Sequence, residues 1–160
     1  MMGFLTRLFA RTEPALSEAS PRDAGAIAAL HGVSFHRGWS DGEIEALLID
    51  RNVVAHRAMA GRRLAGFILS RRAAGEAEIL SVAIAAARRG RGLSRRLLDL
   101  HLRRLAGLGT RTVFLEVDEH NVPARRLYAR AGFREVGRRE SYYQDQPGKS
   151  TAALVLRRDL

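Results

Sequence analysis

Residues 79–98, ILSVAIAAARRGRGLSRRLL, join an apolar run to a leucine-rich stretch through a turn of arginines and glycines. The run at residues 79–84 predicts a buried strand, and the leucines that follow the turn at helical spacing predict a helix. The first amides of a helix lack intrahelical partners, and the helix dipole favours negative charge there. This order of elements predicts an α/β fold with a phosphate held on the turn at residues 88–94.

Gly90 and Gly92 add to this prediction. Glycine lets the backbone approach a ligand closely, and consecutive N–H groups form a nest for an anion. The alternative is a tight strand-to-helix turn whose arginines are only solvated. The turn by itself does not distinguish the two interpretations.

The composition limits the kinds of site that the chain can build. Its 160 residues suit one domain with a real core, because about 70% of the unfolded surface is buried at this size. The absence of cysteine excludes disulfides and thiolate metal sites. The five histidines do not show the spacing of metal ligands, so we expect no metal cofactor.

The basic charge has two explanations. The formal net charge is +10, and Lys149 is the only lysine. Such a surplus attracts polyanions, whether a nucleotide, RNA or an acidic membrane. The high content of arginine and alanine also follows from GC-rich coding, without any partner. The arginines scatter in twos and threes, which argues against a basic tail.

Residues 1–13 form an expected appendage to a domain at residues 14–160. The appendage has the pattern of a short amphipathic helix, which either packs on its own domain or docks on a membrane or partner. It lacks the features of a signal peptide, and no apolar run approaches the ~20 residues that span a bilayer. We therefore expect a cytoplasmic protein.

The remaining pattern predicts a mixed sheet with helices on its faces. Ser20 before Pro21, and Ser40 with Glu43 three residues on, are helix-start signals. Three strands in a row, followed by alternating helices and strands, indicate a meander and then βαβ units. The expected strands are 15–19, 53–59, 63–70, 76–84, 112–117, 133–143 and 151–156, and the helices begin near residues 20, 40, 93 and 121.

Glu116 is a candidate proton acceptor. Val113, Leu115 and Val117 share one face of their strand, which leaves Phe114 and Glu116 on the other. A carboxylate near the end of a buried strand is costly unless it is paired, and burial makes it a better base for an ammonium group. The alternative is an ion pair with one of the many arginines.

Asn121 and Tyr128 lie two helical turns apart. If Asn121 caps the helix, Tyr128 lies on nearly the same face, where its phenol can donate a proton to a leaving group. The alternative is a core tyrosine on an amphipathic helix.

These residues together resemble a known family. Residues 89–94, RGRGLS, resemble the Q/R-x-x-G-x-G/A acetyl-CoA motif of the GNAT N-acetyltransferases, although Ser94 stands where that motif has glycine or alanine. Residues 115–143, LEVDEHNVPARRLYARAGFREVGRRESYY, and residues 34–48, SFHRGWSDGEIEALL, are similar to the RimI type within it. The resemblance covers residues 15–160 and implies one GNAT-like domain, whose mostly antiparallel sheet is splayed between two parallel central strands.

The resemblance also implies roles for single residues. Glu116 would accept the proton of the incoming amine, and Tyr128 would protonate the departing CoA thiolate. Trp39, Tyr142 and Tyr143 would wall the peptide slot. The residues implied for acetyl-CoA binding are Val82, Ala83, Ile84, Arg89, Gly90, Arg91, Gly92, Leu93, Ser94, Arg95 and Asn121.

The implied activity is direct acetyl transfer to a protein N-terminal amine, most directly the N-terminal alanine of small-subunit ribosomal protein eighteen. The short polar loop at residues 144–150 would leave an open slot that favours a peptide. An acidic rim of Glu116, Asp118, Glu119 and Asp145 would attract it, and contact with RNA would be incidental. The alternatives are a GNAT enzyme for another amine (another N-terminus, a lysine or a small molecule) and a basic RNA- or partner-binding domain on a GNAT shell.

Overall fold

The computed structural model describes residues 12–140 and 151–160. Within these residues, seven strands form one sheet in the order β1-β2-β3-β4-β5-β7-β6, and only β4 and β5 pair in parallel. The predicted α/β class and mixed sheet are confirmed. In chain order the elements are β1 (Ala15–Glu18), η1 (Pro21–Asp23), α1 (Ala24–Ser34), α2 (Asp41–Ile49), β2 (Val53–Ala60), β3 (Arg63–Ala73), β4 (Glu76–Ile84), η2 (Ala86–Arg88), α3 (Leu93–Gly107), β5 (Thr112–Asp118), α4 (Val122–Arg130), β6 (Arg134–Glu140) and β7 (Ala152–Asp159).

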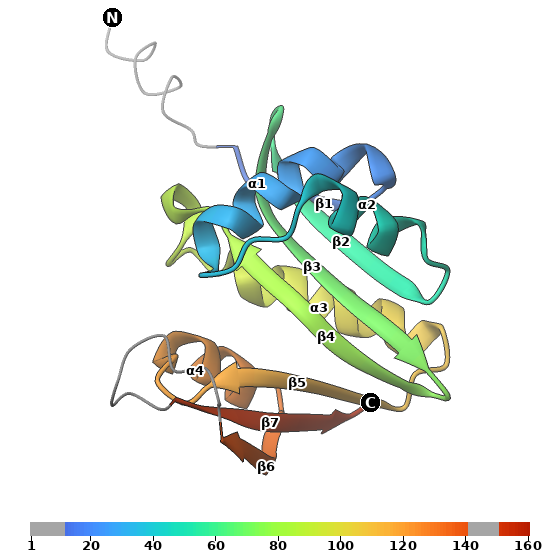
Figure 1. Ribbon diagram of the computed structural model, residues 1–160, viewed down its shortest axis with the longest axis vertical. Coiled ribbons are helices and arrows are strands. Elements are labelled where there is room, and N and C mark those ends of the chain that lie inside the picture. The colour runs from blue at the N-terminus through green and yellow to red at the C-terminus, as the bar shows by residue number, and fades with distance from the viewer. Residues whose placement is uncertain (1–11, 141–150) are drawn as a thin grey trace, which may run out of the picture.

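Helices cover both faces of the sheet, as predicted (Figure 1). α1 and α2 lie on one face of the β1–β4 half and build a core around Ile27, Ile44 and Phe67. α3 and α4 pack on the opposite face, where the leucines of α3 meet Val113 and Leu115 of β5. Because α1 and α2 stop short of β5, the strands β5, β7 and β6 keep one open face.

The two parallel strands separate halfway along β4. They pair from Glu76 with Thr112 to Ile79 with Leu115, and no pairing follows. The register between β3 and β4 shifts at the same point, which leaves Leu80 as the extra residue of a bulge. A bulge bends its strand and increases the local twist. The end of β4 therefore turns away from β5, as the resemblance implied.

Local hydrogen bonds set the helix starts that the sequence predicted. Ser40 and Glu43 form the capping box of α2, with Ser40 Oγ accepting from the Glu43 amide at 3.2 Å. Asn121 caps α4 by accepting from the Ala124 amide at 3.2 Å.

One turn differs from the prediction. β3 runs on through residues 71–73, which pair with the first residues of β4, so only Ala74 and Gly75 form the turn. Cross-strand hydrogen bonds in a long hairpin therefore outweigh the polar, turn-like composition of residues 71–75.

Several predictions fall outside the described residues. They are the amphipathic helix of the appendage, the end of the strand predicted at 133–143, the loop at 144–150, and the side chains of Tyr142, Tyr143 and Asp145. No helix within residues 12–140 and 151–160 has the length and apolar character needed to cross a bilayer.

Candidate active site

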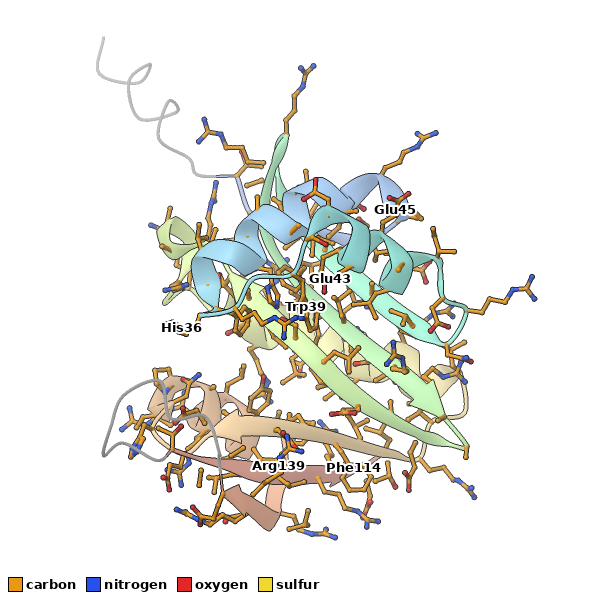
Figure 2. The ribbon with its side chains drawn as sticks, viewed as in Figure 1. His36, Trp39, Glu43, Glu45, Phe114 and Arg139 are labelled. Atoms are coloured by element: carbon orange, nitrogen blue, oxygen red, sulfur yellow. The ribbon has the colours of Figure 1, made fainter. Side chains whose placement is uncertain are left out.

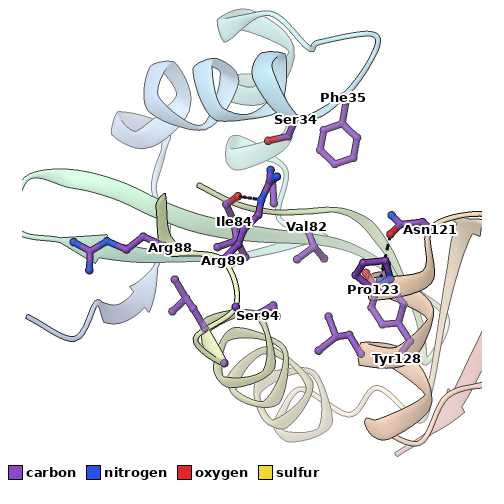
Figure 3. Close-up of a pocket in the computed structure, with 16 residues that line it drawn as sticks. Ser34, Phe35, Val82, Ile84, Arg88, Arg89, Ser94, Asn121, Pro123 and Tyr128 are labelled. Carbon is purple, nitrogen blue, oxygen red and sulfur yellow. Dashed lines mark hydrogen bonds between the residues drawn. The ribbon is translucent and has the colours of Figure 1, made fainter. Parts of the chain in front are cut away.

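A cavity of about 440 Å³ opens where β4 leaves β5. The end of β4 forms one wall, α4 forms another, and the turn before α3 closes one end (Figure 3). The lining includes ten residues that the sequence pointed to, namely Val82, Ala83, Ile84, Arg89, Gly90, Gly92, Leu93, Ser94, Asn121 and Tyr128. The fold therefore brings together residues 82–94 and residues 121–128, which are well separated in sequence.

The turn before α3 has the geometry of an anion site. Gly90 and Gly92 both have positive φ, at 75° and 77°, which favours glycine because a Cβ is disfavoured there. Gly92 is the N-cap of α3 and offers no side chain, so the first amides of the helix keep no intrahelical acceptor. Among the residues that the structure describes, Arg88 and Arg89 are the charged residues of the lining, and no Asp or Glu of residues 12–140 and 151–160 belongs to it. This end of the cavity suits a phosphate group.

The arginines of the turn do different things. Arg89 Nε donates to the carbonyl of Ile84 at 3.0 Å, which fastens the turn to the end of β4. Arg91 lies outside the cavity and lines a small depression beside Thr12 and Glu13. Arg95 also lies outside the lining and pairs with Asp99 at 3.2 Å. The amides are thus better placed than these two guanidinium groups to meet a ligand in the cavity.

Tyr128 reaches the cavity from α4. Its ring is 7% exposed and packs edge-on against Phe133, with the ring centroids 5.6 Å apart. Burial raises the pKa of the phenol to about 12. The hydroxyl is therefore protonated at neutral pH and is able to donate a proton. The interpretation as a core tyrosine is confirmed, and the residue also lines the cavity, whereas its role as proton donor stays a prediction.

Glu116 lies on the other side of the divergent strands. It lines a second cavity of about 820 Å³, which we call the acidic groove, together with Trp39, Glu43, Asp50 and Glu78. The groove runs between α2 and the open face of β4 and β5, and a smaller cavity that Glu78 and Glu116 also line continues it.

The carboxylate of Glu116 is not buried, which differs from the expectation. Its side chain is 36% exposed because α1 and α2 leave this face of β5 uncovered, and its Oε2 accepts from Arg139 Nη2 at 2.7 Å. The alternative raised from the sequence, an ion pair with an arginine, is thus present.

Of the acidic residues predicted for the rim, Glu116 lines the groove, whereas Asp118 and Glu119 do not. Asp118 accepts from the backbone amide of His120, and Glu119 pairs with Arg138 at 2.7 Å, so neither lines the groove. Their carboxylates are instead replaced by those of Glu43, Asp50 and Glu78, which come from α2, from its C-cap and from β4. Among the lining residues Arg71 is the cation, and it lies 3.8 Å from Asp50.

Trp39 is held at the groove by a residue that the sequence did not single out. The Trp39 amide donates to His31 Nδ1 at 3.1 Å, and the two rings stack with their centroids 4.4 Å apart. Burial lowers the pKa of His31, although Glu43 opposes the shift, so the imidazole stays neutral and accepts. Ser34 and Phe35, which line the first cavity, were missed as well, because nothing in the sequence places the end of α1 beside β4.

The match to a protein-family model covers most of this domain. The model of the acetyltransferase (GNAT) family matches residues 24–133. This stretch runs from the start of α1 to the residue before β6, and it contains both the turn at Gly90 and Glu116.

Known proteins resemble the chain in sequence and in fold. The [ribosomal protein bS18]-alanine N-acetyltransferase of Haemophilus influenzae is 34% identical over 94 residues, which are 59% of this chain and 64% of that protein. The chain thus matches less than two thirds of that relative. The crystal structure of the ribosomal-protein-S18-alanine N-acetyltransferase from Escherichia coli superposes with a TM-score of 0.83 at 22% identity, covering 91% of this chain and 93% of that one.

A second solved structure contains a ligand. The crystal structure of Arabidopsis thaliana NAA60 in complex with acetyl-CoA superposes with a TM-score of 0.78 at 20% identity, covering 92% of this chain and 98% of that one. At these identities the structural likeness establishes the fold. The family model, whose match spans more than half of the sequence, establishes that the chain belongs to the acetyltransferase (GNAT) family.

Proposed function

We propose that this protein transfers the acetyl group of acetyl-CoA to a free N-terminal amine of a protein, with the N-terminal alanine of ribosomal protein bS18 as the first candidate. The observation that carries the proposal is the separation of β4 from β5. It lies between a cavity with a phosphate-suited end and an acidic groove on the opposite side. The name of the Haemophilus relative supports the choice of acceptor.

The first cavity would hold acetyl-CoA. The amides of the turn at Gly90 to Ser94 would bind the pyrophosphate, because four residues of this turn line the cavity beside Arg88 and Arg89 and lead into the start of α3. The end of β4 has no strand partner on the β5 side, so the backbone groups of Val82 to Ile84 that do not bond to β3 are available to the pantetheine, apart from the Ile84 carbonyl, which accepts from Arg89. Asn121, at the N-cap of α4, would contact the CoA moiety from the other wall.

The acidic groove would hold the acceptor. An N-terminal amine is cationic before it reacts, and the lining has four carboxylates against one guanidinium in a chain whose net charge is +10. Opposite charge near a binding site steers a cationic ligand toward it. The open shape suits a peptide, of which only the first residues need to enter.

The reaction would proceed by direct attack. Glu116 takes a proton from the ammonium group, directly or through a water, and the neutral amine attacks the thioester carbonyl. A backbone N–H at the end of β4 stabilises the oxyanion. The C–S bond then breaks, the thiolate takes a proton from Tyr128, and the second proton of the amine nitrogen, lost as the amide forms, returns to the Tyr128 phenolate through water. Glu116 releases its proton to solvent, so the products are the N-acetylated peptide, free CoA and one proton.

Three peptides test the proposal. CoA release is measured with acetyl-CoA and a peptide with a free N-terminal alanine, the same peptide N-blocked, and an N-blocked peptide whose only amine is a lysine. We expect turnover of the first peptide alone. Equal turnover of the lysine peptide would overturn the N-terminal assignment, and release of CoA from none of them would overturn the proposed acceptor class.

A further inference from the structure

We infer that Arg139 of β6 is a positioning residue, which fixes the Glu116 carboxylate so that its second oxygen faces the incoming amine. This inference rests on the proposed function, because it takes Glu116 as the proton acceptor. Within residues 12–140 and 151–160, Arg139 is the hydrogen-bond partner of the Glu116 side chain, with 2.7 Å between Nη2 and Oε2. Oε1 accepts no hydrogen bond from the residues that the structure describes, and it would be the oxygen that meets the substrate.

The sheet register brings the two residues together. Glu116 of β5 pairs with Val155 of β7, and Val155 pairs with Gly137 of β6. Directly paired residues lie on the same face of a sheet, and so do residues two apart on one strand. Arg139 therefore lies on the face of Glu116, one pair further along, where it pairs with Ala153.

Small side chains leave the path open. Gly137 on β6 and Ala153 on β7 are the small residues beside this route, and the guanidinium crosses β7 between Ala153 and Val155 on the face of Glu116 (Figure 2). Asp118 is the carboxylate in the same row as Arg139, but its Oδ1 accepts from the backbone amide of His120 at 2.7 Å. Arg139 instead bonds diagonally to Glu116.

The negative charge of the groove explains why Glu116 needs the contact with Arg139. Glu43, Asp50 and Glu78 line the groove with Glu116, and carboxylates that share a site disfavour one another's ionised form. Arg71, the cation of the lining, lies beside Asp50. Arg139 supplies the compensating charge at Glu116 and, through a directional N–H bond, the orientation that proton transfer needs.

The pair is exposed enough to serve catalysis rather than stability. The side chains of Arg139 and Glu116 are 70% and 36% exposed, and exposed ion pairs contribute little to the stability of a fold. Loss of Arg139 should therefore leave folding intact while it changes the reaction.

A double-mutant cycle tests this inference on the full chain with the alanine peptide. We expect Arg139→Ala to lower kcat about tenfold, with KM for acetyl-CoA within twofold of wild type, because a free carboxylate samples unproductive rotamers. In the Glu116→Gln background the same substitution should change kcat less than twofold, because an arginine that acts through Glu116 has nothing left to orient. Arg139→Lys, which keeps the charge but loses the planar fork, should recover part of the rate.

The control is Arg134→Ala, which removes a guanidinium from the same strand, where Arg134 lies 3.8 Å from Asp159. Two outcomes would overturn the inference: Arg139→Ala lowers kcat equally in the wild-type and Glu116→Gln backgrounds, or Arg134→Ala lowers kcat as much as Arg139→Ala. Either would show that the loss of an arginine disturbs β6 and not the Glu116 carboxylate. A faster Arg139→Ala enzyme would also overturn it, since Arg139 would then compete with the amine.

The cycle separates this inference from the proposed function. A Glu116→Gln variant as fast as wild type removes Glu116 as the proton acceptor and overturns both. An impaired Glu116→Gln variant beside an unimpaired Arg139→Ala variant overturns the inference alone. A wild-type protein that does not acetylate the alanine peptide also overturns both.

Discussion

The cavity at the turn before α3 and the acidic groove lie on opposite sides of β4, yet they are built by different means. The first uses backbone: left-handed glycines, the free amides of a helix start, and a strand end that pairs with β3 but not with β5. The second uses side chains from α2, β4 and β5, most of them carboxylates. Backbone amides suit a cofactor that never changes, whereas side chains are free to vary with the acceptor.

The largest expected effect belongs to the groove. Glu116→Gln should lower kcat/KM for the alanine peptide at least about 100-fold near neutral pH, because general-base catalysis contributes 10²–10⁴-fold. The rate should recover at higher pH, where the amine loses its proton to solvent. Steady-state kinetics between pH 7 and 9.5 measure this recovery. The CoA dissociation constant is measured as well. If Glu116→Gln binds CoA more weakly, the groove and the cavity do not act independently.

Tyr128 belongs to the cavity, and in the proposed reaction it acts last, as the proton donor to the thiolate. Tyr128→Phe should lower kcat about 10–100-fold while KM for acetyl-CoA stays within twofold, because the ring remains packed against Phe133 and only the proton is lost. Because burial raises the pKa of Tyr128 to about 12, the wild-type enzyme should show no loss of rate from its ionisation below about pH 10. A thermal unfolding midpoint equal to that of wild type is the control, and an unchanged kcat would contradict the role.

Gly92 tests whether the cavity depends on its backbone. An alanine at φ 77° costs about 1–2 kcal/mol, and relaxing that strain turns the helix amides away from a ligand. We expect Gly92→Ala to weaken CoA binding about tenfold in calorimetry. Gly61→Ala is the matched control, since Gly61 has φ 62° in the turn between β2 and β3 and, like Gly92, has open space around its Cβ position. Equal CoA affinity for the two variants would argue against the amide site.

A buried histidine on α3 makes the stability of the whole fold depend on pH. On α3, His101 is fully buried, with Nε2 2.6 Å from Ser70 Oγ and Nδ1 2.7 Å from His56 Nδ1. Burial, and to a lesser extent the nearby His56, lowers the pKa of His101 to about 3, whereas the unfolded chain binds this proton near pH 6.5. Unfolding takes up the proton between these values, so stability is present above pH 6.5 and falls as the pH drops.

The slope from this group should approach about 1.4 kcal/mol per pH unit. Urea unfolding at pH 7.5, 6.5 and 5.5 measures it. The dependence should flatten in His101→Leu but not in His120→Asn, since the His120 side chain is 72% exposed. The same slope in the wild type and in the His101 variant would rule out this source.

The smallest effect concerns the groove's selectivity. Glu78→Gln should raise KM about threefold for an alanine peptide with arginines after its first residue, and should leave a peptide without charged side chains unchanged. Glu45→Gln is the control, because Glu45 lies on α2 outside the lining (Figure 2). An equal change in KM for both peptides would mean that Glu78 does not interact with the charged side chains of the acceptor.

The sequence by itself determined what depends on near neighbours. The order of elements, the capping box of Ser40 and the cap of Asn121 rest on hydrogen bonds and periodicities within a few residues. The strand, turn and helix around Gly90 and Gly92 also depend on residues close in sequence, so the sequence alone predicts this turn. Residues 89–94 also resemble the acetyl-CoA motif of the family, and this resemblance narrows the prediction from a generic anion site to a site for acetyl-CoA.

Only the tertiary structure decided what depends on register and on the course of distant segments. Glu116 was expected on a buried strand, but α1 and α2 stop short of β5 and leave it exposed beside Arg139, 23 residues away. The carboxylates of the groove come from α2, its C-cap and β4, not from the residues beside Glu116 in sequence. The bulge at Leu80 and the pairing of β5, β7 and β6 decide which of these side chains lie close together. No short sequence window contains that information.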